Sequence, residues 1–100
     1  MALGDLQNLT ILAVAQLGED AVARGVREFL ATETGREVAV PTIFVTLTRL
    51  EDQGLLKSVE GDAPERGGRR RRVFAVTQKG WGAVKSARAA SEKLWAGLDR

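Results

Sequence analysis

The most distinctive feature of this sequence is a short run of positively charged residues. Five arginines lie between Arg66 and Arg72, and no acidic residue lies among them. The formal net charge of the whole chain is only +2, so the charge is concentrated rather than spread. A basic patch on a nearly neutral chain predicts a defined surface for a polyanion.

Residues that carry catalysis or bind metals are scarce. The sequence contains no cysteine and no histidine, which removes the thiolate nucleophile, the disulfide, and the commonest general base and metal ligand. Carboxylates, lysines, serines and threonines remain, and they form no recognisable catalytic cluster. We therefore expect no catalytic residues, no metal site and no cofactor, and we do not expect an enzyme.

The length of 100 residues indicates one small domain. A single core of this size gives only modest stability, so a second subunit that buries more area is expected before any motif is considered. No apolar run approaches the roughly 18 residues of a membrane span. The N-terminus also lacks a cationic segment before its apolar stretch, and these features predict a soluble cytoplasmic protein.

The arginines fall at the tip of an expected β-hairpin. Residues 55–59 and 69–76 have strand composition and flank a loop over 61–68 that contains glycine and proline. Phe74 and Val76 would face the core. A tip this basic can enter a minor groove or clamp phosphates, and a solvated or disordered charge run is the alternative. The predicted DNA-contacting residues of this wing are Arg66, Gly67, Gly68, Arg69, Arg70, Arg71 and Arg72.

A short helix should precede the hairpin. Pro41 suits the first turn of this helix, and Gly54 suits the position just after its end. Ile43, Leu47 and Leu50 recur at helical spacing and form a narrow apolar stripe. The other side chains suit close approach to base edges and phosphates in a major groove, although an ordinary amphipathic helix is the alternative. The predicted groove contacts are Pro41, Thr42, Val45, Thr46 and Arg49.

Two further helices should come earlier in the chain. Asp5 can cap a helix that runs to about Gln16 and ends at Gly18. Asp20 can cap a second helix over about 21–33. Residues 37–40 are β-prone and are the only candidate for a third small strand.

The first and last helices predict a dimer. The first is apolar around most of its circumference, so one face should need a second subunit. Thr77 can cap a last helix over about 78–98, whose small and apolar residues follow coiled-coil spacing; a helix folded back on its own domain is the alternative. The predicted interface contains Leu6, Leu9, Ala13, Trp81, Val84, Ala87, Ser91, Leu94, Trp95 and Leu98. Trp81 and Trp95 could instead line a pocket for a small aromatic effector.

Four segments together resemble the PadR family of bacterial winged-helix transcriptional regulators. They are LxxLxILAVAxLGED (Leu6 to Asp20), TGREV (Thr34 to Val38), TIFVTLTRLEDQGLL (Thr42 to Leu56) and PERGGRRRRVFAVTQKG (Pro64 to Gly80). The resemblance implies homodimers that bind pseudo-palindromic operators, usually as repressors, with small-molecule sensing in some members. The chain is similar to the short form, which has a single C-terminal dimerisation helix. It departs at Phe44, where the family usually has a tyrosine, so one hydroxyl contact to a phosphate would be missing.

The sequence therefore predicts an α+β, mainly α fold: a winged helix-turn-helix with a two-stranded wing and a C-terminal dimerisation helix. Residues 1–77 would bind DNA, and residues 78–100 would form the dimerisation helix, packed with the N-terminal helix in one continuous structural domain. The expected function is sequence-specific binding of double-stranded DNA by a homodimeric repressor. The alternative is a winged-helix module that docks proteins, whose binding would lack a steep salt dependence.

Overall fold

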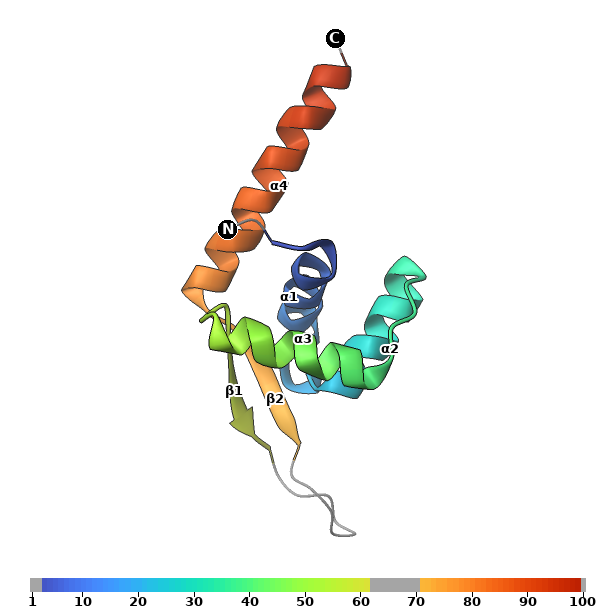
Figure 1. The fold of residues 1–100 in the computed structure, drawn as a ribbon, viewed down its shortest axis with the longest axis vertical. Coiled ribbons are helices and arrows are strands. Elements are labelled where there is room, and N and C mark those ends of the chain that lie inside the picture. Colours follow the sequence, from blue (N-terminus) through green and yellow to red (C-terminus); the bar gives the residue numbers. More distant parts are fainter. Residues whose placement is uncertain (1–2, 62–70, 100) are drawn as a thin grey trace.

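The computed structural model describes residues 3–61 and 71–99. These residues form helices, a 3-10 turn and one antiparallel hairpin (Figure 1). In chain order the elements are α1 (Asp5–Leu17), η1 (Gly18–Asp20), α2 (Ala23–Thr34), α3 (Val40–Asp52), β1 (Leu56–Glu60), β2 (Arg72–Val76) and α4 (Gln78–Leu98). The mainly α winged helix-turn-helix class is confirmed. No helix in the described ranges is long and apolar enough to cross a membrane.

The core lies where α1, α2 and α3 meet the base of the hairpin. The apolar stripe predicted on α3 is buried, since Ile43, Leu47 and Leu50 have no exposed surface. Phe74 of β2 is also buried, and its N–H donates to the Ala21 carbonyl at 2.9 Å. This bond fixes β2 to the turn that precedes α2, so the hairpin base is part of the core.

The hairpin pairs its two strands in a simple register. Leu56 faces Val76, Ser58 faces Phe74, and Glu60 faces Arg72 at the outer end of the ladder. Because side chains alternate between the two faces of a strand, these pairs share one face.

The starts of α1 and α2 differ from the predictions. Gly4 caps α1, and Asp5 lies in the first helical turn. Asp20 belongs to the 3-10 turn η1, and Val22 occupies the cap position of α2. Gly18, which ends α1 as predicted, has a φ of 56° and turns the chain directly into η1, so α2 begins later than expected.

The predicted strand over residues 37–40 is wrong. Ala39 caps α3 and Val40 already lies inside the helix, because Pro41 suits the first helical turn. Val38 packs against the core as an irregular segment.

The residues that follow α3 are bonded to the start of α4. Gly54 follows α3 with a φ of 78°, as predicted for the residue that ends the helix. The Thr77 hydroxyl accepts from Gly80 N at 3.0 Å, which confirms the predicted cap, and it donates to the Gly54 carbonyl at 2.7 Å. Lys79 Nζ donates to the Gln53 carbonyl at 2.8 Å. We call Gln53, Gly54, Thr77 and Lys79 the α3–α4 junction.

Candidate nucleic-acid interface

In Figure 1, α3 runs across the base of the hairpin, and one face of this helix is exposed. No acidic residue occurs between Val40 and Leu50, so a polyanion can approach this face without like-charge repulsion. Phe44 and Val45 are nearly half exposed. Of the predicted groove contacts, those on this exposed face are Pro41, Thr42, Val45 and Arg49.

Thr46 does not lie on this face. Its side chain is only 9% exposed, and its hydroxyl donates to the Thr42 carbonyl at 2.9 Å. Threonine in a helix commonly makes this bond to the preceding turn. The prediction that Thr46 lies on the outer surface is therefore wrong, because the position falls next to the buried stripe of Ile43, Leu47 and Leu50.

The wing arginines divide into three groups. Arg66, Gly67, Gly68, Arg69 and Arg70 lie outside the described residues. Arg71 is exposed, and its guanidinium makes no ion pair or hydrogen bond with any residue that the structure describes. Arg72 is engaged within the subunit, although its side chain is 46% exposed.

Arg72 joins the hairpin to α3. Its Nη2 donates to Glu51 Oε1 at 2.7 Å and its Nε donates to Ser58 Oγ at 2.8 Å. Ser58 Oγ in turn donates to Glu51 Oε2 at 2.5 Å, which closes a ring of three side chains. The guanidinium also lies 5.7 Å from the centroid of the Phe74 ring. We call the three hydrogen-bonded residues the Glu51–Ser58–Arg72 cluster.

A groove of about 460 Å³ lies where the start of α2, the first half of α3 and the start of β2 meet. Arg24, Phe44 and Arg71 are among the residues that line it. Arg24 is exposed near the start of α2 and extends the basic surface beyond the wing. The sequence places Arg24 only on the wet side of an amphipathic helix, and the packing of α2 across α3 is what brings it to this surface.

Several solved structures similar to this chain are PadR-like regulators, whereas no family model and no curated protein matches it. A PadR-like transcription factor from Bacteroides fragilis has a TM-score of 0.77 and 23% identity, covering 94% of this chain and 86% of that chain. A PadR family regulator from Eggerthella lenta has a TM-score of 0.73 and 27% identity, covering 95% and 83%. A PadR family regulator from Clostridium difficile has a TM-score of 0.76 and 16% identity, covering 96% of both chains. The chain has a PadR-like winged-helix fold.

Seven of the predicted interface residues occupy three environments in this PadR-like subunit. Ala13 and Val84 are buried in the subunit's own core, so they cannot contact a partner directly, and that part of the interface prediction is wrong. Leu6 and Leu9 are half-buried against the same core. Leu94, Trp95 and Leu98 are 66–76% exposed on the outer part of α4, which projects from the body of the subunit (Figure 1).

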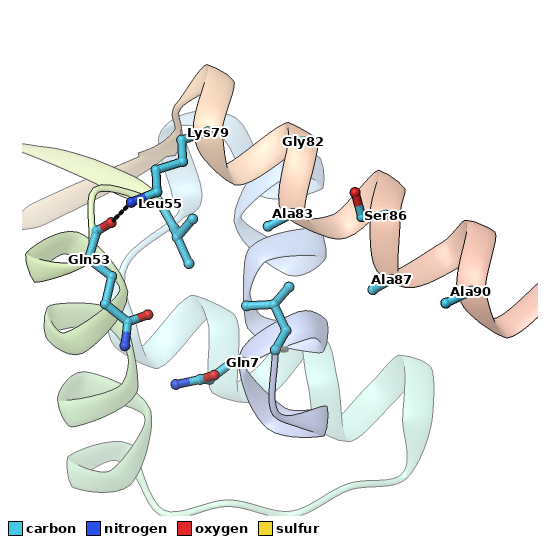
Figure 2. Close-up of a pocket in the computed structure, with 10 residues that line it drawn as sticks. Gln7, Gln53, Leu55, Lys79, Gly82, Ala83, Ser86, Ala87 and Ala90 are labelled. Carbon is cyan, nitrogen blue, oxygen red and sulfur yellow. Dashed lines mark hydrogen bonds between the residues drawn. The ribbon is translucent and has the colours of Figure 1, made fainter. Parts of the chain in front are cut away.

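A groove of about 670 Å³ lies between α1, the end of α3 and α4. Figure 2 shows Ala83, Ala87 and Ala90 pointing from α4 into this space, with Gln7 and Leu55 on the other side. We call it the α1–α4 groove. Beyond Lys79, its α4 wall consists of small side chains, which allow another helix to approach closely.

Trp81 and Trp95 do not meet in one pocket. Trp81 lines a separate groove of about 380 Å³ on the back of the hairpin, beside Val59 and Ala75. Trp95 lies about 21 Å farther along the axis of α4, given the rise of an α-helix. One PadR-like subunit therefore does not bring together the two tryptophans of the predicted effector pocket, and the pocket stays a prediction.

Proposed function

We propose that this protein is a transcriptional regulator that binds specific double-stranded DNA sequences and represses transcription. The observation that carries the proposal is the exposed, acid-free face of α3 next to the cationic edge of the hairpin. The PadR-like architecture supports the same assignment. As an intracellular DNA-binding protein it would act in the cytoplasm.

The proposed binding mode places α3 in a major groove and the wing on the flanking backbone. Thr42, Val45 and Arg49 would contact base edges, because they are exposed on the leading face of α3. Arg71 and the arginines at 66, 69 and 70 would contact phosphates. Arg24 extends this cationic surface on the other side of Phe44.

We further propose that the protein acts as a homodimer on a pseudo-palindromic operator. The exposed apolar residues at the outer end of α4 would be costly in a lone subunit. They match the α1–α4 groove in chemistry, so the outer part of each α4 would cover the groove of the other subunit. Residues 78–100 would then serve dimerisation and residues 1–77 DNA binding. The two α3 helices would lie about one DNA turn apart, roughly 34 Å.

An aromatic effector would have to act at the subunit interface, since one subunit does not bring the two tryptophans together. The α3–α4 junction supports such control, because its hydrogen bonds make α3 follow α4. A change in the angle between the two α4 helices would therefore alter the spacing of the α3 helices. Titration of tryptophan fluorescence with planar aromatic compounds tests this extension, and a flat response to all of them would remove it.

Fluorescence anisotropy with labelled duplex DNA at several salt concentrations tests the DNA-binding proposal. Four to six phosphate contacts per dimer predict a log–log slope of about −4 to −5. The competing function is a winged-helix module that docks a protein through α3. If the protein does not bind duplex DNA, or if its affinity for DNA does not depend on salt, the competing function is favoured.

A further inference from the structure

The Glu51–Ser58–Arg72 cluster connects three elements of the DNA-binding surface. Glu51 lies in the last turn of α3, Ser58 in β1 and Arg72 at the start of β2. We propose that this cluster is a positioning device that sets the direction of the wing relative to α3, and that Arg72 is not a phosphate contact. The inference rests on the proposed DNA-binding function and assigns different roles to two neighbouring wing arginines.

The internal bonds of the cluster use both carboxylate oxygens of Glu51, the Ser58 hydroxyl, and Nε and Nη2 of Arg72. Both carboxylate oxygens of Glu51 are engaged, one by Arg72 and one by Ser58, and Ser58 Oγ also accepts from Arg72 Nε. The Glu51 side chain is only 23% exposed, so solvent screens this ion pair less than a fully exposed one. A closed ring of this kind restrains all three side chains together.

Phe74 and Arg72 of β2 each attach the hairpin to the rest of the subunit by a specific bond. The buried ring of Phe74 and its bond to the Ala21 carbonyl hold the base of β2 in the core. Arg72 lies at the outer end of the described ladder opposite Glu60. One attachment point would let the hairpin pivot, whereas two points along the same strand fix its direction.

A rival role for Arg72 is to leave Glu51 and contact DNA. That movement would break two hydrogen bonds and expose an unpaired carboxylate beside the phosphate backbone, where like charges repel. Arg71, the preceding residue in the chain, already has a guanidinium without a partner among the described residues. Arg71 is therefore the arginine available to a phosphate, and Arg72 keeps the hairpin in place.

Hydrogen–deuterium exchange of the free protein tests the positioning role without DNA. Glu51→Ala and Arg72→Ala should each speed exchange of the β1 and β2 amides, because local opening of the hairpin becomes easier. The double variant should add little to either single variant, because both remove the same ring. Arg71→Ala is the matched control and should leave exchange unchanged. Wild-type exchange rates in both Glu51→Ala and Arg72→Ala would overturn the proposal.

Salt-dependent DNA binding tests the second part of the proposal. Arg71→Ala should reduce the log–log slope by about 2 per dimer, since each lost phosphate contact contributes about 0.9. Arg72→Ala should weaken binding with no change in slope, and Arg72→Lys should weaken it as well, because lysine keeps the charge but cannot reproduce both bonds. A loss of slope in Arg72→Ala equal to that in Arg71→Ala would overturn the assignment. If the wild-type protein bound no duplex DNA, the proposed function would fail, and the exchange data alone would decide whether the cluster restrains the hairpin.

Discussion

Arg49 and Thr46 lie one helical turn apart on α3 and have opposite environments. Arg49 is exposed on the proposed DNA-contacting face, whereas the Thr46 hydroxyl is bonded to its own helix. Arg49→Ala should change the preferred base at one position of each half-site, at a cost of about 1–3 kcal/mol. Thr46→Val keeps the side-chain shape and should leave the preference unchanged. Binding to a set of single-base operator variants measures both effects, and altered preference in Thr46→Val alone would contradict the assignment.

Gly80 is required where α4 crosses the hairpin. A Cβ at this position would collide with the Leu55 carbonyl oxygen and would lie 2.9 Å from Val76 Cγ1. Gly80→Ala should therefore lower the free energy of unfolding by about 1–3 kcal/mol through overpacking. Gly97→Ala is the control in the same helix, because a Cβ there meets nothing within 4 Å. Urea denaturation measures the stability of both variants. A Gly80→Ala protein as stable as the wild type would refute the close approach of Gly80 to the Leu55 carbonyl.

Residue-level predictions from the sequence were good where a residue type has a local requirement. Pro41, Gly54 and Thr77 lie at the helix ends for which proline, glycine and threonine are suited. The environment of Arg72 could not be predicted, because its partner Glu51 is 21 positions away and neither composition nor periodicity relates them. The place of Arg24 on this surface could not be predicted either, because it depends on the packing of α2 across α3.

The type and order of the helices and strands can be predicted from hydrophobic periodicity and from the glycines and prolines that mark their ends. The predicted order of helices and the hairpin is confirmed, and the boundaries moved by a few residues. Residues 37–40 are the exception. β-Branched residues there predict a strand, but Val38 is used for core packing and Val40 for the start of α3.

The α3–α4 junction should be a substantial local contribution to stability. Thr77→Ala removes both the cap of α4 and the bond to the Gly54 carbonyl, so we expect a loss of about 1–2 kcal/mol in the free energy of unfolding. Thr77→Ser keeps the hydroxyl and should retain most of that stability. Thermal unfolding of the two variants measures the difference, and a fully stable Thr77→Ala protein would mean that the junction is not rigid.

At the scale of the whole molecule, the outer part of α4 is the clearest sign of a missing partner. Leu94→Glu combined with Leu98→Glu should produce a monomer that keeps its fold, because both leucines are 76% exposed in the subunit. Ala89→Glu is the control for added charge, since it lies on the opposite side of α4 from the leucines by helical spacing. Sedimentation velocity measures the oligomeric state. A wild-type monomer, or a dimeric double variant, would contradict the proposed interface.

The most direct test of the account is selection of bound sequences from random duplex DNA by the full-length protein. We expect an inverted repeat whose half-sites are about one helical turn apart, because a twofold axis would relate the two copies of α3. Recovery of sequences with no enriched motif, or of a single half-site without symmetry, would contradict it.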